Sequence, residues 1–386
     1  MIKPMYFAFL YSSCSYLNRR VFGALGREDR PRSSAIECLR RTEPVLPSFQ
    51  TLRRLRQASL FSLLLASLSI ADVSAESKLF VAFAMTKAQQ ASSLPTDSGI
   101  FLQGPGDETW GRIGPVIQAM NSVASDPSDP STIFIACGNG IVRSRDNGAS
   151  WRMVTGWRES DFTKIAIDPK NGDNIYAASV WGLSISRDGG ESWQSANKGL
   201  KEQYCRSVVV DQRNSKRILL GTDDGIYVSR DRAESWSAIR TSPKSNILRM
   251  ARSGADLDLW IVGTEGEGVF LSRNDGKTWE SVSSELSEKN LYAVALHSES
   301  ASRMAVGGWD AGVWMSDDSG KTWADRSAGL PSMNVTAMSF DPKRADRLWA
   351  STFEEGTFYT DDFGKTWKDG NLYGAYVLDL GIIPVE

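Results

Sequence analysis

Three carboxylates stand at equivalent positions of consecutive sequence repeats, namely Asp223, Glu265 and Asp310. Hydrolysis of a glycosidic bond needs two carboxyl groups about 5–5.5 Å or about 6.5–9.5 Å apart, one of them with a raised pKa. Two of these residues that face each other across a central opening would meet that requirement. They are therefore the candidate catalytic residues, although the pattern alone selects no pair.

The segments around these carboxylates also carry aromatic and charged side chains. They include Trp157, Arg158, Trp181, Asp224, Glu267, Trp309, Phe353, Glu354 and Glu355, with Tyr204, Arg206, Tyr292 and Tyr376 where repeats begin. Aromatic rings stack on sugar rings and carboxylates accept hydrogen bonds from hydroxyl groups, so this composition suits a polyhydroxylated ligand. The alternative is that acids in Gly-containing segments are simply good turn formers.

Other chemistry has less support in the sequence. His297 is the only His, and it holds the turn position that Asp168 and Asp341 hold in other repeats, which excludes a Ser-His-acid triad. No Cys/His cluster has metal-ligand spacing, and the Gly-rich segments are turns rather than phosphate loops, so no metal and no cofactor is predicted. Cys137 and Cys205 belong to different repeats, and no disulfide between them is predicted.

The repeats are marked by a ladder of seven Trp residues. These are Trp110, Trp151, Trp193, Trp236, Trp279, Trp323 and Trp367, with spacings of 41, 42, 43, 43, 44 and 44 residues. A period in the forties indicates an array of supersecondary units, and each unit here contains four short strand patterns separated by Gly, Pro, Asn and Asp. In the third unit these are 163–168, 174–179, 183–186 and the strand after Trp193. The sequence therefore predicts an all-β, seven-bladed β-propeller of four-stranded antiparallel blades.

The two ends of the chain predict how the ring closes. The first repeat has strand patterns at 79–84 and 100–102 but no innermost strand before them, whereas 376–384 is an innermost strand with no blade after it. We expect the C-terminal strand to complete the first blade, so that residues 76–386 form a single propeller.

Six of the Trp residues end a short motif, Ser/Thr-x-Asp-x-Gly-x-Ser/Thr-Trp. Its Asp holds a tight turn by accepting backbone N–H bonds, its Gly tolerates positive φ, and its Trp fills the space between blades. The motif is complete at 144–151, 186–193, 316–323 and 360–367, has Asn274 for Asp at 272–279, and has Ala233 for Gly at 229–236. The structural residues are Asp146, Trp151, Asp188, Trp193, Asp231, Trp236, Asn274, Trp279, Asp318, Trp323, Asp362 and Trp367.

The connectivity of such blades sorts their loops onto two faces. The motif hairpins lie on one face, and the candidate ligand-binding and catalytic residues above lie on the other, around the central opening. On the motif face Arg145, Arg187, Arg230 and Arg273 hold the second motif position in four successive repeats. These arginines predict a site for an acidic partner; the alternative is solvated hairpin charges that were copied with the repeat.

With these motifs the chain resembles the Asp-box (BNR repeat) propellers. That group includes sialidases, sortilin-type receptors, family-74 xyloglucanases and photosystem II assembly factors, and the resemblance implies that the boxes are structural and carry no catalytic role. The sialidase Arg-Ile-Pro strand is absent, since 111–114 reads Gly-Arg-Ile-Gly. Family-74 enzymes place their cleft between two propellers, whereas the ladder predicts one.

The first 75 residues predict a leader with a signal peptide. Arg53, Arg54 and Arg56 precede an apolar run at 60–71, too short to span a membrane, and cleavage is expected near Ala75. Residues 1–50 reflect either a start assigned too early or a bipartite leader. The remaining chain has 33 Lys/Arg and 41 Asp/Glu, which excludes a general nucleic-acid binder.

Taken together, these features predict an exported, monomeric and non-catalytic propeller, secreted or periplasmic, or lumenal in a photosynthetic source. It would bind a glycan or an extracytoplasmic protein through its loop face. The alternatives are a glycosidase-like hydrolase and an assembly factor that docks through the arginines.

Overall fold

The described part of the protein is all-β. The structure is a computed structural model that describes residues 77–85, 98–104, 109–117, 119–282 and 284–384, so the leader predicted for 1–75 lies outside the described residues. Residues 68–386 form one compact unit, which contains all of the strands. Within its described residues the chain forms seven four-stranded antiparallel sheets. No helix in this part of the chain is long and apolar enough to cross a membrane.

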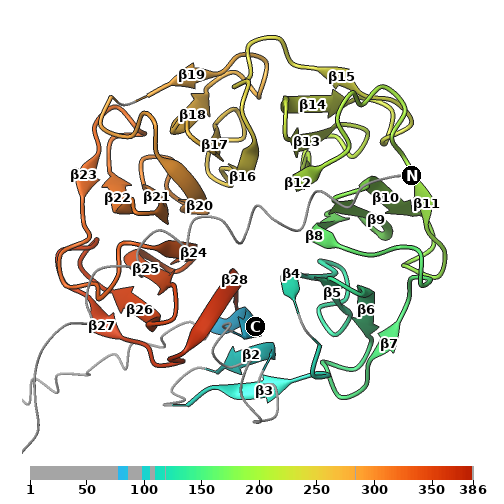
Figure 1. The fold of residues 1–386 in the computed structure, drawn as a ribbon, viewed down its shortest axis with the longest axis horizontal. Coiled ribbons are helices and arrows are strands. Elements are labelled where there is room, and N and C mark those ends of the chain that lie inside the picture. Colours follow the sequence, from blue (N-terminus) through green and yellow to red (C-terminus); the bar gives the residue numbers. More distant parts are fainter. Residues whose placement is uncertain (1–76, 86–97, 105–108, 118, 283, 385–386) are drawn as a thin grey trace, which may run out of the picture. The chain divides into compact units, whose positions relative to one another are not determined.

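The seven sheets are the blades of a propeller, numbered here in chain order (Figure 1). From the centre outward, blade 1 is β28 (Ala375–Pro384), β1 (Ser77–Met85), β2 (Gly99–Gln103) and β3 (Gly111–Ile113). Blade 2 is β4 (Met120–Ser125), β5 (Ile133–Cys137), β6 (Gly140–Ser144) and β7 (Arg152–Met153). Blade 3 is β8 (Phe162–Asp168), β9 (Asn171–Ser179), β10 (Gly182–Ser186) and β11 (Gln194–Ser195).

The other four blades follow the same order. Blade 4 is β12 (Cys205–Val210), β13 (Ile218–Thr222), β14 (Gly225–Ser229) and β15 (Ser237–Ala238). Blade 5 is β16 (Ile247–Arg252), β17 (Trp260–Thr264), β18 (Val269–Ser272) and β19 (Glu280–Ser281). Blade 6 is β20 (Asn290–Leu296), β21 (Met304–Trp309), β22 (Gly312–Ser316) and β23 (Ala324–Asp325). Blade 7 is β24 (Val335–Asp341), β25 (Arg344–Thr352), β26 (Gly356–Thr360) and β27 (Lys368–Asp369).

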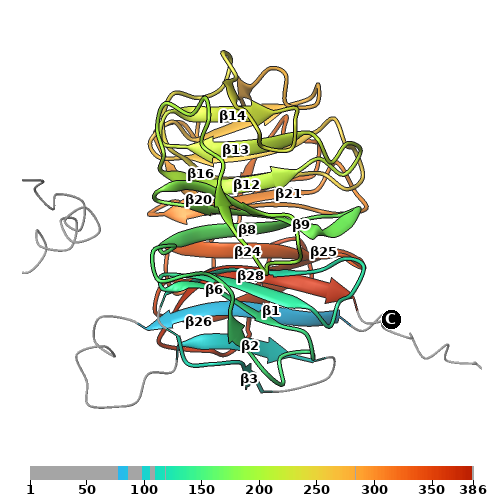
Figure 2. The ribbon, with the colours of Figure 1, turned by 90° about the vertical axis from the view of Figure 1, so that its right-hand side faces the viewer.

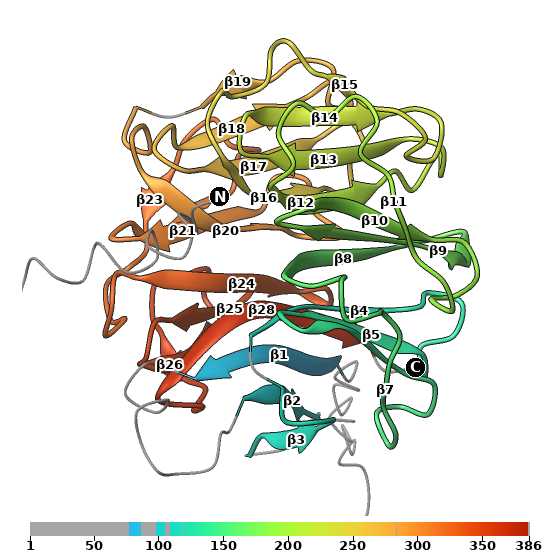
Figure 3. The ribbon, with the colours of Figure 1, turned by 45° about the vertical axis from the view of Figure 1, so that its right-hand side comes forward.

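The innermost strands form a closed ring around a central axis. β4, β8, β12, β16, β20, β24 and β28 contact one another in that order, and β28 contacts β4. The strands run roughly along the axis of the ring, as the views in Figures 2 and 3 show. The predicted seven-bladed propeller is therefore confirmed.

The ring is closed by the C-terminal strand, as predicted. β28 pairs antiparallel with β1 from Ser77↔Pro384 to Met85↔Ala375, which joins the last of the described strands to the first of them. β1 in turn pairs with β2, so blade 1 is built from both ends of the propeller unit. An edge strand with no partner exposes a row of backbone donors and acceptors, and this pairing removes that edge.

The first hairpin of blade 3 is tighter than predicted. Asn171 and Gly172 were expected in the turn, but β9 begins at Asn171, which pairs with Asp168. Only Pro169 and Lys170 remain between the strands. The N–H of Lys170 donates to Oδ1 of Asp168 at 3.0 Å, and this local bond lets the turn close over two residues.

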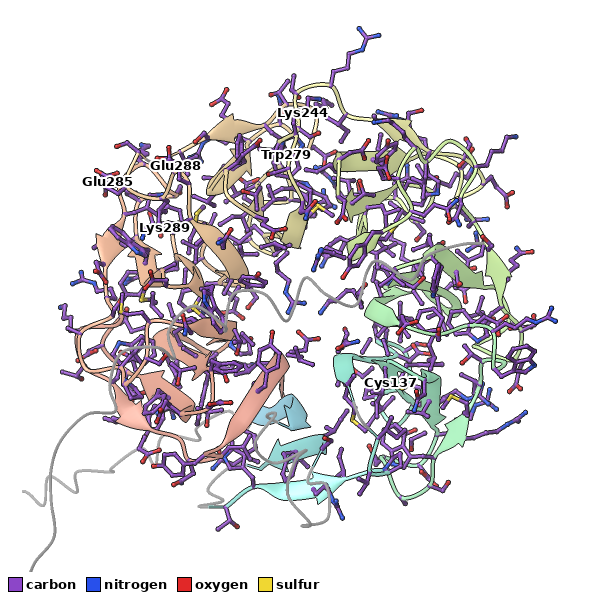
Figure 4. The ribbon with its side chains drawn as sticks, in the orientation of Figure 1. Cys137, Lys244, Trp279, Glu285, Glu288 and Lys289 are labelled. Atoms are coloured by element: carbon purple, nitrogen blue, oxygen red, sulfur yellow. The ribbon has the colours of Figure 1, made fainter. Side chains whose placement is uncertain are left out.

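The hydrophobic core lies between blades. Tyr176 and Leu183 of blade 3, for example, pack with Val208, Leu220 and Trp236 of blade 4. The two described cysteines, Cys137 and Cys205, are free and buried. Figure 4 shows Cys137 in blade 2 and Trp279, another rung of the ladder, in blade 5.

Every innermost strand is interrupted by a bulge at the same place. The register shifts between Met120 and Ser122 in β4, and equivalent shifts follow in β8, β12, β16, β20 and β24 and opposite Ala82 in β28. Bulges bend a strand and re-aim its side chains. Side chains beyond the bulges reach the next blade, where Oγ of Ser122 accepts the N–H of Ile165 and Oγ of Ser207 accepts that of Met250. The free inner edges are thus partly satisfied by neighbouring blades.

Candidate functional site

The Asp boxes have one geometry in six blades. The first-position hydroxyl accepts the N–H of the fifth residue at 2.8–2.9 Å. The Asp or Asn oxygen accepts the N–H of the seventh residue at 2.8–3.0 Å. Hydrogen bonds from the seventh residue are the main cause that lowers the pKa of Asp146, Asp188, Asp231 and Asp318 to about 2 from 3.8. These carboxylates are ionised turn anchors, in keeping with a structural role.

The ladder Trp side chains differ in how their indole N–H groups are satisfied. Those of Trp110, Trp236 and Trp367 donate to backbone carbonyls of the preceding blade at 2.7–2.8 Å, whereas that of Trp151 donates to Gly148 of its own box. The buried N–H groups of three others have no acceptor among the described residues: Trp193, Trp279 and Trp323. At these three rungs, ring packing rather than a hydrogen bond to the described residues holds the side chain.

We expect Ala233→Gly to stabilise the protein. Ala233 replaces the box glycine and has φ of 70°, a left-handed conformation that costs an L-residue about 1–2 kcal/mol. Glycine loses more chain entropy on folding, so the net gain in the free energy of unfolding should be at most about 1 kcal/mol. Urea denaturation measures it.

The matched opposite change is Gly190→Ala in blade 3. Gly190 has φ of 82°, and an added Cβ would lie 2.8 Å from Cε1 of Phe134, so this variant should be destabilised. An Ala233→Gly variant less stable than the parent would show that the buried Ala233 methyl contributes more by packing than it costs in backbone strain.

Arginines on the box face link successive blades. In blades 3, 4, 5 and 6 the backbone carbonyl of the fourth box residue accepts a hydrogen bond from a guanidinium of the preceding blade. The four donor–acceptor pairs are Arg143–Gly189, Arg187–Arg232, Arg217–Asp275 and Arg273–Ser319. We call this contact the box clasp.

The box clasp uses some of the four box-face arginines predicted to bind an acidic partner. We call these four the arginine arc: Arg145, Arg187, Arg230 and Arg273. Arg187 and Arg273 are clasp donors, and Arg145 pairs with Glu191 at 3.1 Å. Arg230 is exposed and has no hydrogen bond or ion pair among the described residues. Three of the four guanidinium groups thus already have partners within the propeller.

On the loop face, side chains of blades 4 and 5 meet beside the central axis. Arg206, which lies at the bulge of β12, pairs with Asp223 at 3.4 Å, and its guanidinium lies 4.3 Å from the ring centroid of Tyr204. Glu265 accepts a hydrogen bond from the side-chain amide of Asn246. Burial raises the pKa of Asp223 above its ordinary value although Arg206 opposes the shift, and the charge of Glu265 adds to it. Asp223 and Glu265 are therefore electrostatic neighbours.

A row of aromatic rings continues this group across blades 6, 7 and 1. Trp309 and Phe353 meet edge to face with centroids 5.1 Å apart, and Phe353 meets Tyr376 in the same way at 5.2 Å. Burial raises the pKa of Tyr376 to about 12. Burial and the charge of Glu265 raise the pKa of Tyr292, although Arg206 opposes this shift. We call the whole set the mouth cluster: Tyr204, Arg206, Asp223, Asn246, Glu265, Tyr292, Trp309, Phe353 and Tyr376.

A second aromatic patch lies on the loop side of blades 2 and 3. Trp157 is 85% exposed and has the guanidinium of Arg158 at 4.8 Å from its ring. Trp181 is 63% exposed, and its indole N–H donates to Oδ2 of Asp161 at 3.3 Å. These rings face solvent, as a stacking role requires.

The remaining loop-face acids are less closely associated with the mouth cluster. Asp224 accepts hydrogen bonds from Thr222 at 2.9 Å and Tyr227 at 3.1 Å, which stabilise its own turn. Glu267 accepts the backbone N–H of Lys244 at 3.3 Å. Asp310 and Glu354 are turn residues with positive φ, and both are exposed.

His297 is buried and acts as a turn residue. Nδ1 of its ring accepts the N–H of Glu299 at 3.1 Å, and Nε2 lies 3.0 Å from the carbonyl oxygen of Asp341 in the next blade. Its position in the turn before β21 agrees with the interpretation from the sequence.

Four residues near the axis were not singled out from the sequence. Asn246 orients Glu265, and Lys164 and Arg249 both pair with Asp379 on the innermost strands. Superposing the repeats on their bulges places Lys164, Arg249 and Asp379 at one equivalent position. A comparison of that single repeat position would have revealed them.

The fold and the boxes together define the class: the chain is a seven-bladed β-propeller that carries the Asp-box motif in six of its blades. Residues 267–374 match the Sortilin-Vps10 family model, described as sortilin, neurotensin receptor 3. No curated protein matches the chain.

The solved structures that this chain resembles include GH74 enzymes and YCF48. The GH74 enzyme of Niastella koreensis is 19% identical with a TM-score of 0.61, over 70% of this chain and 50% of that one. The GH74 xyloglucanase of Xanthomonas campestris is 19% identical with a TM-score of 0.55, over 65% and 45%. YCF48 bound to D1 peptide is 16% identical with a TM-score of 0.51, over 65% and 81%. The chain thus spans about half the length of the GH74 enzymes, and the likeness is one of fold.

Proposed function

We propose that this protein is an exported binding propeller that holds a glycan on its loop face without cleaving it. The observation that carries the proposal is the mouth cluster. It combines rings from Trp309, Phe353 and Tyr376 on blades 6, 7 and 1 with a paired cation and carboxylate, Arg206 and Asp223, on the same face of blade 4. Sugar binding combines stacking on such rings with directional hydrogen bonds from a few fixed polar groups.

The charges in the cluster favour binding over catalysis. Asp223 is engaged by Arg206 and Glu265 by Asn246, so two of the three candidate carboxylates already have a partner that fixes their orientation. Loops on a rigid propeller are well placed to carry such a site. A fixed acid next to a guanidinium suits hydroxyl recognition.

A hydrolase is the second candidate, and one observation favours it. The pKa of Asp223 is raised by burial, as a general acid requires, and Glu265 lies close enough to act on it electrostatically. The similar GH74 structures are named as enzymes, one of them a xyloglucanase.

The arginine arc supports a third role less well. YCF48 is similar in fold and is described bound to a D1 peptide, so a protein ligand belongs in the same test. On this chain, however, only Arg230 of the arc has no partner among the described residues. A peptide would therefore find one unpaired arc guanidinium.

Binding and sugar release should be measured together on a panel of polysaccharides and sialosides, with acidic peptides as a further arm. We expect saturable glycan binding without release of soluble sugar. Trp309→Ala should weaken binding about tenfold, equivalent to about 1.4 kcal/mol of lost stacking. Isothermal titration calorimetry measures the change.

Arg230→Ala is the matched control, because it removes an exposed side chain on the box face and should leave the affinity unchanged. Sugar release that disappears in Asp223→Asn or Glu265→Gln would establish the hydrolase instead. A folded protein that binds no glycan but captures acidic peptides would contradict the proposal.

A further inference from the structure

The residues that follow the seven bulges form a layer around the axis of the propeller. In ring order they are Ser122, Lys164, Ser207, Arg249, Ala293, Ala337 and Asp379. Four are small, and three are charged. The layer therefore carries two cations and one anion, all at equivalent positions of different blades.

The two cations both approach the carboxylate of Asp379. Nζ of Lys164 lies 2.8 Å from Oδ2 of Asp379, and Nη1 of Arg249 lies 3.6 Å from Oδ1. The side chains are only 21%, 17% and 15% exposed for Lys164, Arg249 and Asp379. Burial alone would raise the pKa of Asp379, but the two cations offset this and hold it below its ordinary value. The carboxylate is thus ionised and shared.

Donors outnumber acceptors at this point. Oδ2 of Asp379 already accepts both Lys164 and the backbone N–H of Val123, at 3.3 Å. Arg249 uses Nη2 for the carbonyl of Leu378 at 2.9 Å. A Lys ammonium has three donors and an Arg guanidinium five, so most of the N–H groups of this pair remain available. Burial lowers the pKa of Lys164 although Asp379 opposes the shift, so a further anion here would stabilise the charged ammonium and supply acceptors for the excess donors.

A cavity adjoins these donors. Its volume is about 170 Å³, well above the roughly 10–15 Å³ that one water molecule requires. The residues that line it include Lys164, Arg249 and Asp379 together with Ala293, Ala337 and Leu380. Because Ala293 of β20 and Ala337 of β24 have small side chains, they leave space in the layer that the charged residues also line.

We propose that this central cavity is a binding site for a small oxyanion, a carboxylate or a phosphate, held by Lys164 and Arg249. The oxygens of the oxyanion would accept hydrogen bonds from the N–H groups that do not bond to Asp379. Charge-assisted hydrogen bonds of this kind are stronger than those between neutral groups. The apolar wall of Ala293 and Ala337 would face the rest of the ligand. This site lies in the bulge layer and does not depend on the glycan proposal.

The test is binding of acetate and of inorganic phosphate to the purified protein, each against sodium chloride at equal ionic strength. We expect a saturable rise in Tm and a heat of binding with a midpoint in roughly the millimolar range. Acetate alone, phosphate alone or both will identify the carboxylate, the phosphate or their shared chemistry. Equal effects of all three salts would overturn the proposal.

Two variants distinguish an anion site from an ion cluster with a purely structural role, because they should change the affinity for the anion in opposite directions. Lys164→Met should weaken binding by at least about tenfold, the worth of one charge-assisted bond, whereas Lys170→Met on the exposed hairpin of the same blade should not. Asp379→Asn should tighten binding, because it removes the competing carboxylate but keeps its shape. If Lys164→Met fails to fold, Arg249→Lys replaces it. Unchanged affinity in Lys164→Met, or weaker binding in Asp379→Asn, would refute the site.

Discussion

Deletion of residues 375–386 is expected to abolish cooperative unfolding of the propeller. These residues are β28, which pairs with β1 along nine register positions and packs against β24 on one side and β4 on the other. Val377 and Leu380 are buried with Ala337 of β24. Without β28 the ring opens, β1 becomes a free edge, and Lys164 and Arg249 lose Asp379. Calorimetry and circular dichroism measure the loss.

A matched control removes only residues 385–386, which leaves all of β28 in place. It should melt like the parent. Adding a synthetic peptide of residues 375–386 to the long truncation should restore part of the transition, since strand addition can supply the missing edge in trans. A long truncation that melts at the temperature of the parent would mean that blade 1 does not close the ring.

The second large effect is expected from Trp236→Ala. Trp236 is 5% exposed, packs with Tyr176, Leu183 and Val208, and donates its indole N–H to the carbonyl of Ala196 at 2.8 Å. Loss of so large a buried ring should lower the free energy of unfolding by about 3–5 kcal/mol, a large part of the ~5–15 kcal/mol that stabilises a domain. Guanidinium denaturation monitored by circular dichroism tests this.

Trp157→Ala is the control for that experiment. It removes the same side chain from a site that is 85% exposed, so the free energy of unfolding should change by no more than about 0.5 kcal/mol. Similar losses in the two variants would show that the ladder ring does not contribute through burial. Trp323→Ala, whose N–H has no acceptor among the described residues, would then separate ring packing from hydrogen bonding.

The sequence predicted the architecture because its signals are local and repeated. Seven Trp residues at near-constant spacing and six box motifs specify the blade, and a missing first strand paired with a surplus last one specifies the closure. Each signal rests on turn chemistry or burial that is the same in every repeat. The strand after the turn at Pro169 and Lys170 was predicted to start at residue 174, three residues too late, because strand ends depend on pairing as well as on composition.

The centre of the molecule was harder to predict. A bulge has no signature in a single strand, so the common position of Lys164, Arg249 and Asp379 was not evident from the chain. The box clasp depends on backbone carbonyls, which every residue has. The residue types of the acceptors therefore give no sign of it: Gly189, Arg232, Asp275 and Ser319. Asp223 and Glu265 were named, but their partners Arg206 and Asn246 come from the starts of strands and were not assigned to them.

The pairing of β28 with β1 has a consequence for how the protein is made. During synthesis β1, β2 and β3 leave the ribosome first, yet their innermost partner is completed only when the last residues of β28 have been translated. Blades 2 to 7 each consist of consecutive strands and can fold as they emerge, whereas blade 1 must wait for the whole chain. A chain that ends within β28 would therefore carry an open seam, and its unpaired β1 is the edge through which such a chain would pair with other molecules.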